Sequence, residues 1–313
     1  MKDCYILAIE TSCDDTAIAI AHNEQILSSV VLSSQVKHKR YGGIVPEIAA
    51  RNHETNLAIC YKQAIKLAKI KVTNLTHISY TVSPGLPGSL HMGKIFAKSL
   101  AKLLKIPLIP IDHIYGHVYS FAINNIKQIS YPFMSLIVSG GHTSIYLVKS
   151  VNDIRTLNQK NDDAIGEILD KVGRTLGFSY PGGVNIDKSF NPNKTNLKLI
   201  HHFKPEAKFS FSGIKTHIFN LINNIKMKKQ RVDKILISSS LLKWVVNEVM
   251  IKLNFYLQKY PQVKFITIGG GVSANQLLRK EVKKLTKPVF LPNLKYTNDN
   301  AAMIALYTYL IVK

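Results

Sequence analysis

The chain has 313 residues, 46% of them hydrophobic, which is enough apolar material for a sizeable core and excludes a mainly disordered protein. This length favours two domains or one domain with two lobes. Lysine and arginine outnumber aspartate and glutamate by 41 to 19, giving a formal net charge of +22; this favours a nucleic-acid partner, although a biased genome would produce the same lysine-rich composition without a binding role.

The apolar runs near the two ends of the sequence do not predict membrane insertion. The first, Tyr5–Ile9, is shorter than the apolar region of a signal peptide. The last, Ala301–Val312, is below the ~18 residues that a membrane span needs. The three cysteines, Cys4, Cys13 and Cys60, form an odd, sparse set that suits reduced thiols. We therefore expect a cytoplasmic protein with no membrane partner.

The first third of the sequence combines short apolar runs with helical patterns. Runs rich in apolar and β-branched residues predict strands, at residues 5–10, 16–21, 25–33 and 78–82. Pro46 is typical of a helix start and predicts a helix to about residue 67. A glycine- and proline-rich loop at 83–88 precedes a second helix, whereas residues 34–43 are expected to be loop.

Similar elements are predicted after residue 109. Apolar runs predict strands at residues 133–138, 144–148 and 264–268. Helical spacing of apolar residues predicts helices at residues 163–176, 217–229, 238–260 and 274–285. Residues 179–216 are rich in Asn, Pro, Gly and Ser and are expected to be irregular.

Two segments of the sequence share one plan. Leu7–Ile20 and Leu136–Leu147 each consist of an apolar run, a small polar turn that ends in threonine, and a second apolar run. One interpretation is a duplicated α/β lobe with a cleft between the copies. The other is a pair of ordinary hairpins.

A glycine motif precedes the predicted helix after residue 87. Gly88–Lys94 has the spacing of a phosphate-binding P-loop, but Ile95 stands where that loop needs Ser or Thr for magnesium. This excludes a Walker-type ATPase. The motif still fits either a general anion site at a helix start or a tight strand-to-helix turn.

His113 and His117 are four residues apart, so a helix would place both imidazoles on one face, the geometry in which two histidines share a metal. Ile114 stands where zinc proteases of the H-E-x-x-H kind have a glutamate, which excludes that chemistry. Metal binding would need a third ligand. The alternative is a structural histidine pair.

Three further motifs have both a functional and a structural interpretation. Gly269–Asn275 forms a glycine turn that lacks the context of an NAD site, but a nucleotide could pack on its backbone. Glu167 and Asp170 share one helix face, which is solvated unless Tyr180–Gly183 folds back towards it. Asp299 precedes the last apolar run and is expected to cap a helix unless it has a functional role.

Together these motifs form an ordered series. They are Ile9-Glu-Thr-Ser-Cys-Asp14, Ser34-Gln35, Tyr41-Gly-Gly-Ile-Val-Pro-Glu47, Pro84-Gly85-Leu86, His113-x3-His117, Val138-Ser-Gly-Gly-His-Thr143, Tyr180-Pro-Gly-Gly183, Phe209-Ser-Phe-Ser-Gly-Ile-Lys-Thr216, Gly269-Gly-Gly-Val-Ser-Ala-Asn275 and Thr297-Asn-Asp-Asn300. The series closely resembles the bacterial tRNA threonylcarbamoyladenosine synthases, the TsaD family once called glycoproteases. The resemblance covers nearly the whole chain.

This resemblance implies an α/β fold of two RNase-H-like lobes around a nucleotide cleft, as in actin, Hsp70 and sugar kinases. The implied lobes are residues 1–108, closed by a C-terminal helix at 300–313, and residues 109–299, each with a helical insertion. The implied enzyme transfers a threonylcarbamoyl group from L-threonylcarbamoyladenylate to N6 of adenosine 37. That adenosine lies just 3′ of the anticodon in tRNAs reading codons that begin with A, and AMP is released.

The resemblance also implies site residues, although it assigns no catalytic side chain. The implied metal ligands are His113, His117 and Asp299, which would hold one divalent ion per subunit, usually iron, with zinc as the alternative. The implied substrate-binding residues are Ile137, Val138, Ser139, Gly140, Gly141, Asp170, Gly183, Asp187 and Asn275. Glu10 and Asp14 are expected to face the reacting group.

Four partners are implied: tRNA, threonylcarbamoyladenylate, a TsaB-like protein of the same fold and a TsaE-like ATPase. If the positive charge serves tRNA, we expect an early set of cations to matter more than a late set. The early set is Lys37, Lys39 and Arg40, and the late set is Lys226, Lys228 and Lys229. Two alternatives remain, an actin-fold ATPase or small-molecule kinase and a catalytically silent partner subunit. The retained metal triad argues against both.

Overall fold

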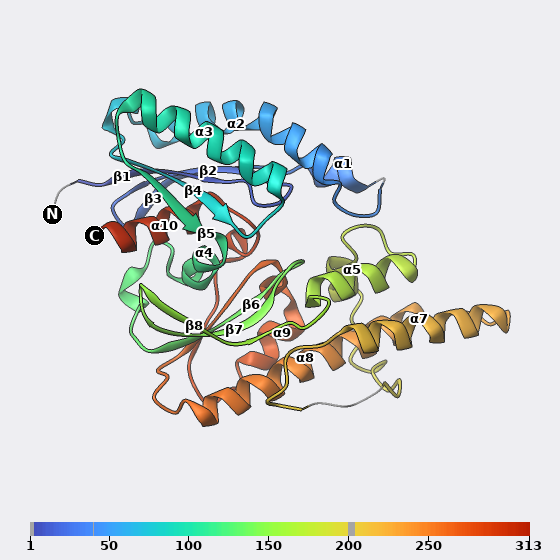
Figure 1. Cartoon of the computed structure of the whole chain (residues 1–313). Coiled ribbons are helices and arrows are strands. Elements are labelled where there is room, and N and C mark those ends of the chain that lie inside the picture. Colours follow the sequence, from blue (N-terminus) through green and yellow to red (C-terminus); the bar gives the residue numbers. More distant parts are fainter. Residues whose placement is uncertain (1–2, 40, 200–203) are drawn as a thin grey trace. The chain divides into compact units, whose positions relative to one another are not determined.

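The computed structural model describes residues 3–39, 41–199 and 204–313. The chain forms two compact units (Figure 1). Unit 1 comprises Met1–Ser130 and Pro292–Lys313, and unit 2 comprises Tyr131–Leu291. The first unit extends beyond the expected boundary at residue 108 because the next strand pairs within its sheet and the following helix packs on the C-terminal helix.

Within the described residues, unit 1 is built on a five-stranded sheet in the order β3-β2-β1-β4-β5. Its strands are β1 (Tyr5–Glu10), β2 (Thr16–His22), β3 (Gln25–Leu32), β4 (His77–Ser83) and β5 (Leu108–Asp112). The hairpin strands β1, β2 and β3 pair antiparallel, whereas β4 and β5 run parallel to β1. The central strands β1 and β2 are apolar along nearly their whole length because both faces of the sheet are covered.

Helices cover the two faces of this sheet (Figure 1). The helices of unit 1 are α1 (Gln35–Lys39), α2 (Pro46–Ala68), α3 (Pro87–Leu104), α4 (His113–Tyr119) and α10 (Ala301–Val312). On one face α2 and α3 pack against β2, β3 and β4, and on the other α10 packs against β1, β2 and β3. The residues of α10 from Ala301 to Tyr309 are all buried, as expected for a helix that is apolar all round.

Unit 2 repeats this topology with a second five-stranded sheet, in the order β10-β9-β6-β7-β8. Its strands are β6 (Phe133–Val138), β7 (Thr143–Ser150), β8 (Asp153–Gln159), β9 (Ile266–Gly269) and β10 (Val289–Phe290). Again the first three strands are antiparallel and the last two run parallel to the first. The two hairpins with one sequence plan are therefore the opening strands of two copies of one lobe.

The helices of unit 2 enclose the larger apolar core. They are α5 (Ile165–Thr175), α6 (Gly182–Lys188), α7 (Ser212–Met227), α8 (Lys234–Lys259) and α9 (Gln276–Val282). The core combines apolar residues of β6 and β7 with those of α5, α7 and α8. Short 3-10 helices complete the two units, at Val72–Asn74, Ser120–Ala122, Ile126–Gln128, Gly271–Ala274 and Leu294–Tyr296.

Most predicted elements are confirmed, and the differences have local causes. The expected loop at 34–43 contains α1, and the expected irregular stretch at 179–216 contains α6. Helix α7 begins at Ser212 rather than residue 217 because the Asp162 carboxylate accepts hydrogen bonds from the Phe211 amide (2.7 Å) and the Ser212 hydroxyl (2.7 Å). Within the described residues, no helix has both the length and the hydropathy that a bilayer span requires.

Candidate functional site

The two histidines of the H-x-x-x-H motif lie at the start and middle of α4. The Asp112 side chain caps this helix by accepting a hydrogen bond from the Ile114 amide (2.8 Å), so that His113 is its first residue. One turn later His117 lies on the same face. Both residues are buried, with 5% and 1% of their surface exposed.

The third predicted ligand lies just before α10. Here Asn300, not Asp299, is the N-cap, because its side chain accepts a hydrogen bond from the Met303 amide (3.0 Å). Asn300 also donates to the Asn298 carbonyl (2.7 Å) and so shapes the preceding loop. The interpretation of Asp299 as a helix cap is therefore wrong, and its carboxylate is available for α4.

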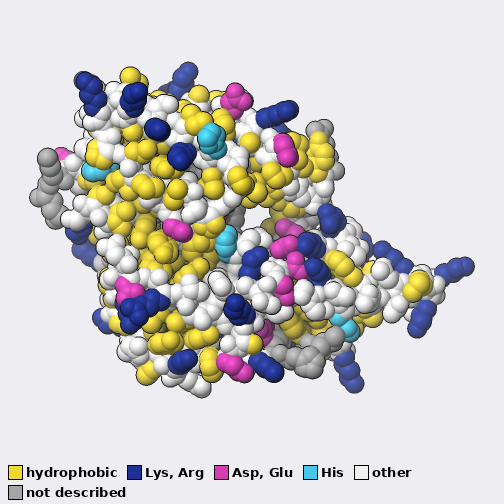
Figure 2. Space-filling model, in the orientation of Figure 1, with side chains coloured by type: hydrophobic (Ala, Val, Ile, Leu, Met, Phe, Trp, Pro, Cys, Tyr) yellow, Lys and Arg dark blue, Asp and Glu magenta, His cyan; other side chains and the backbone are white. Residues whose placement is uncertain are grey.

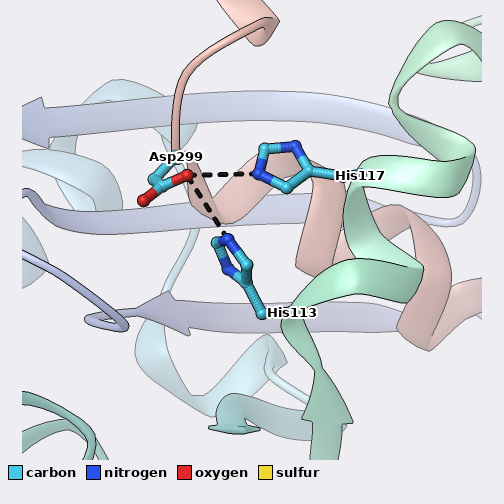
Figure 3. Close-up of side chains that lie close together, drawn as sticks. All are labelled: His113, His117 and Asp299. Carbon is cyan, nitrogen blue, oxygen red and sulfur yellow. Dashed lines mark hydrogen bonds and ion pairs between the residues drawn. The ribbon is translucent and has the colours of Figure 1, made fainter. Parts of the chain in front are cut away.

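Three potential ligand atoms converge in unit 1 (Figure 3). Asp299 Oδ1 lies 3.1 Å from His117 Nε2 and 3.4 Å from His113 Nε2. All three ligand atoms lie within 4.8 Å of one another. The Asp299 side chain is 25% exposed, whereas those of the histidines are 6% and 1% exposed. The histidine side of the site is therefore buried, and the carboxylate side is partly exposed to solvent.

Glu10, at the end of β1, lies on the far side of His113. Its Oε2 accepts a hydrogen bond from His113 Nδ1 (2.9 Å) and one from the Thr81 hydroxyl. Its Oε1 accepts from the Ser12 amide (2.5 Å). Glu10 is fully buried and in contact with His113, and its place at the reacting group stays a prediction. Asp14 is only half-buried, and burial raises the pKa of its carboxyl, against the opposing effect of the nearby His38.

The pKa values of these groups are shifted in a consistent way. Burial alone would lower the pKa of His113, but the carboxylates of Glu10 and Asp299 outweigh it and hold that pKa well above its usual range. Burial likewise opposes ionisation of Asp299, yet His113 holds the pKa of this carboxyl well below its ordinary value. Burial lowers the pKa of His117. The carboxylates of Glu10 and Asp299 thus favour a positive charge at His113.

The predicted substrate-binding residues all lie in unit 2 and begin at the β6–β7 turn. The side chains of Ile137 and Val138 belong to the core, so they could reach a ligand only through their backbone. The Ser139 hydroxyl accepts hydrogen bonds from the amides of Gly141 (3.3 Å) and His142 (3.0 Å), which closes the turn.

Helix α5 and a glycine turn pack against the β6–β7 turn. The Gly166 amide of α5 donates to the Ser139 carbonyl (3.1 Å). A Cβ atom on Gly166 would lie 2.8 Å from the Gly140 backbone. Gly270 has a positive φ of 87°, and a Cβ atom there would overlap the carbonyl oxygen of Val138. Glycine is required at both positions for these close backbone approaches.

The remaining predicted residues are brought together in two groups. Asp170 on α5 accepts a hydrogen bond from the Gly183 amide at the start of α6 (2.8 Å), so the Tyr180–Gly183 stretch does fold back towards it. At the other end of α6, Asp187 accepts from the Gln276 amide (3.1 Å to each carboxylate oxygen). The adjacent Asn275 caps α9 by accepting from the Leu278 amide (2.9 Å).

Comparison with known proteins identifies the family. The family model described as "TsaD: tRNA N6-adenosine threonylcarbamoyltransferase" matches residues 25–306. The chain belongs to the TsaD family. Curated relatives with the same enzyme name include one from Ureaplasma parvum serovar 3 (strain ATCC 27815), 45% identical over 100% of this chain and 97% of the relative. Another, from Malacoplasma penetrans, is 46% identical over 97% of this chain and 98% of the relative.

Solved structures place this TsaD-family chain in the actin- and Hsp70-like ATPase fold. Component A of (R)-2-hydroxyglutaryl-CoA dehydratase from Acidaminococcus fermentans is 14% identical, with a TM-score of 0.59 over 98% of each chain. Full-length HypF is 12% identical, also with a TM-score of 0.59, over 99% of this chain and 46% of HypF. These similarities show the fold alone. The family assignment makes this member a transferase rather than a kinase or a silent partner subunit.

The donor set of this TsaD-family member fits a divalent metal. Two imidazoles and one carboxylate form the facial set that non-haem Fe²⁺ prefers, and Zn²⁺ accepts the same ligands. Two carboxylates, Glu10 and Asp299, lie 2.9 Å and 3.4 Å from the ring nitrogens of His113, so the site favours a positive charge, which a bound ion would supply. His113, His117 and Asp299 would be the ligands.

Sequence reasoning missed the role of two groups at this site. Glu10 was expected at the substrate, and Thr81 was not identified at all. The available signal was that Glu10 ends the apolar run of β1 and that Thr81 lies near the end of β4, since neighbouring parallel strands bring their carboxyl ends to one edge of a sheet. The thiol of Cys13 is not a candidate nucleophile, because burial strongly raises its pKa and the thiolate is the reactive form.

Proposed function

We propose that this chain transfers the threonylcarbamoyl group of L-threonylcarbamoyladenylate to N6 of adenosine 37 in tRNAs reading codons that begin with A. N6 attacks the carbamoyl carbon, the bond from that carbon to the phosphate oxygen breaks, and AMP leaves with the electron pair while N6 loses a proton. Family membership supports the reaction. The convergence of His113, His117 and Asp299 is the observation that carries the proposal for this particular chain.

We infer that the three residues hold one divalent ion, Fe²⁺ in the first instance and Zn²⁺ as the alternative. When bound, such an ion supplies a Lewis acid that polarises a substrate oxygen. The two imidazoles and the carboxylate leave coordination positions open for substrate. The partial exposure of Asp299 supports an approach from its side, since both histidines are buried.

The predicted segments of unit 2 are proposed to bind the adenylate. The assigned residues are Ile137, Val138, Ser139, Gly140, Gly141, Asp170, Gly183, Asp187 and Asn275. A Cβ atom added at Gly140 or Gly141 would have no neighbouring atom within 4 Å, so a phosphate could approach the backbone closely. Backbone amides of a tight turn are well suited to an anion. Asp170, Asp187 and Asn275 hold the surrounding helix ends in place through their hydrogen bonds.

The reaction does not require a nucleophilic side chain. The adenylate is already an activated anhydride, so the enzyme must orient the two substrates and stabilise the charge that develops on the acyl oxygen. The raised pKa of Cys13 agrees with this, because the thiol at the first hairpin turn stays protonated. Covalent catalysis through that residue is therefore not part of the proposal.

The proposed partners are tRNA, a TsaB-like protein of the same fold and a TsaE-like ATPase. Lys and Arg side chains are spread over the helices of unit 1 and gather at the far end of α7 (Figure 2), and the net charge of +22 suits a polyanion. We propose a cytoplasmic location, supported by the three free thiols of Cys4, Cys13 and Cys60, which persist in a reducing compartment.

A single-turnover assay tests this function. Synthetic L-threonylcarbamoyladenylate is mixed with the chain, its partner proteins and unmodified tRNA, and the nucleoside is identified by mass spectrometry. We expect threonylcarbamoyladenosine and one AMP for each nucleoside formed. A matched reaction uses tRNA in which the adenosine 3′ of the anticodon is replaced by guanosine, and should give no product. Turnover of ATP with a small-molecule acceptor, and no tRNA product, would contradict the proposal.

A further inference from the structure

Glu10 is held by three donors from different parts of unit 1. The Ser12 amide donates to Oε1 (2.5 Å), while the Thr81 hydroxyl and His113 Nδ1 donate to Oε2. A carboxylate without water around it is costly unless such donors satisfy it. Here the three donors satisfy both carboxylate oxygens of Glu10.

The contact with Glu10 determines which ring nitrogen of His113 acts as the hydrogen-bond donor. Glu10 accepts hydrogen bonds through both oxygens, from the Ser12 amide and the Thr81 hydroxyl, so the ring nitrogen 2.9 Å from Oε2 is assigned as a third donor. His113 Nδ1 is therefore protonated, and Nε2 is the atom that faces Asp299 (3.4 Å). Metal-binding histidines are oriented by a partner of this kind on the other ring nitrogen.

His117 is held differently. Its Nε2 faces Asp299 (3.1 Å), but within the described residues its buried Nδ1 has no hydrogen-bond partner. Its ring is fixed by packing in α4 and by the edge-on contact with His113, whose ring centroid is 4.6 Å away. The carboxylate of Glu10 thus orients one of the two histidines and not the other.

We infer that Glu10 is a positioning residue for the metal centre. It keeps the proton of His113 on Nδ1 and the ring aimed at Asp299, so that Nε2 is presented as a ligand before an ion arrives. Because Glu10 ends β1 and Thr81 lies on the adjacent β4, the orientation of this ligand is tied to the central strands of the sheet. The inference rests on the proposal that His113, His117 and Asp299 hold a divalent ion.

Cobalt binding to the full chain tests the inference, because Co²⁺ reports both affinity and ligand geometry through its visible absorption. Glu10→Gln keeps the size of the side chain and removes its charge. We expect its dissociation constant for Co²⁺, measured by competition with a chromophoric chelator, to rise about 10–100-fold, with an altered absorption spectrum. The matched control is Glu248→Gln, which neutralises a buried carboxylate of unit 2 paired with Lys252 and should bind Co²⁺ as the parent does.

The outcomes distinguish the inference from the proposal beneath it. If the parent does not bind Co²⁺, the metal centre is wrong and the inference is wrong with it. If the parent binds Co²⁺ and Glu10→Gln binds it with the parental affinity and spectrum, only the positioning role is overturned.

A second measurement uses the parent alone and so applies even if the Glu10→Gln variant fails to fold. In the Zn²⁺-bound parent with ¹⁵N-labelled histidine, NMR should show His113 protonated on Nδ1, and a metal-bound Nδ1 would overturn the inference.

Discussion

At the scale of single residues, neighbouring side chains decide what each polar group can do. Asp299 reaches the histidines of α4 because Asn300 caps α10 in its place. Glu10 lies beneath His113 because Thr81 and the Ser12 amide hold its carboxylate there. The role of Asp299 is therefore determined by the next residue in the chain, and the role of Glu10 by a nearby amide and by a side chain on an adjacent strand.

Gly140 provides a test of the adenylate site. No atom lies within 4 Å of a Cβ placed there, so Gly140→Val should fold as the parent does. The branched side chain would occupy the space needed by a phosphate, and we expect binding of a non-hydrolysable adenylate analogue, measured by calorimetry, to weaken at least about tenfold, or about 1.4 kcal/mol. Gly213→Val, at an equally open position in α7, is the matched control. Unchanged affinity in Gly140→Val would place the nucleotide elsewhere.

Asp15 gives a pH-dependent prediction for stability. Burial, with the nearby Asp14 adding to it, raises the pKa of the Asp15 carboxyl to about 7, and its Oδ1 has no hydrogen-bond partner within the described residues. The unfolded chain ionises this group near pH 4. Ionisation therefore favours unfolding, and the contribution of Asp15 to stability falls as pH rises from about 4 to about 7.

Asp15→Asn removes this effect. The melting temperature of the variant relative to the parent should rise between pH 5 and pH 7 and then stay constant. Asp153→Asn is the control, because Arg155 lowers the pKa of the exposed Asp153 and its loss should give a constant difference over the same range. A constant difference for Asp15→Asn as well would show that Asp15 is ionised in the folded chain across this range.

At the scale of elements, the metal centre depends on how closely α4 approaches α10. A Cβ atom on Gly116 would lie 2.9 Å from Ile304 Cδ1 and 3.0 Å from Met303 Cγ. Gly116→Val should therefore push α4 from α10, costing about 1–3 kcal/mol of stability and separating the two histidines from Asp299. We expect weaker Co²⁺ binding as well as a lower melting temperature, whereas Gly213→Val should change neither. Parental Co²⁺ affinity in Gly116→Val would show that the helix contact does not set the site.

The helices and strands that could be predicted from the sequence are those whose local residue pattern is sufficient to specify them. The continuous apolar runs of β1 and β6 predict buried strands, and Pro46 marks the start of α2. The elements that could not be predicted depend on partners elsewhere. Strand β8 carries mainly polar residues and exists through pairing with β7, and α6 begins with two glycines where Asp170 accepts the Gly183 amide.

The same division applies to the candidate site. The spacing of the two histidines could be read directly, but the third ligand lies 182 residues from His117 and came only from resemblance to a family. No spacing rule predicts that Glu10 meets His113, because that contact depends on the parallel pairing of β1 with β4 and of β4 with β5. Residues of the site that are far apart in the sequence could therefore be brought together only by the tertiary structure, and not predicted from spacing.

At the scale of the whole molecule, the positive charge can serve tRNA or reflect composition alone. Lys37 is engaged with Asn52 (2.5 Å), the Arg40 position and the Lys39 side chain lie outside the described residues, and the late set at the end of α7 is exposed. We predict that replacing the early set by alanine abolishes most tRNA modification and reduces the salt dependence of tRNA binding by about one unit per lost phosphate contact. The late set should have a smaller effect.

A third lysine set controls for charge alone. Lys98, Lys102 and Lys105 are exposed on and just after α3, and their replacement by alanine removes the same formal charge as either other triple variant. If all three variants lose tRNA affinity equally, the charge acts as a diffuse attraction and no set is a specific contact. If the early-set variant modifies tRNA at the parental rate at low and physiological salt, its assignment is wrong.

We expect His113, His117 and Asp299 together to hold the ion on which transfer depends. The direct measurement is elemental analysis and single-turnover transfer on the same preparations of the parent and of His113→Ala, His117→Ala and Asp299→Ala, with His22→Ala, a surface histidine near Asp3, as control. We predict about one ion per chain and full transfer in the parent and control, and loss of both in each of the three variants. Full metal occupancy in the three variants, or transfer at the parental rate without metal, would show that these residues do not hold an ion needed for transfer.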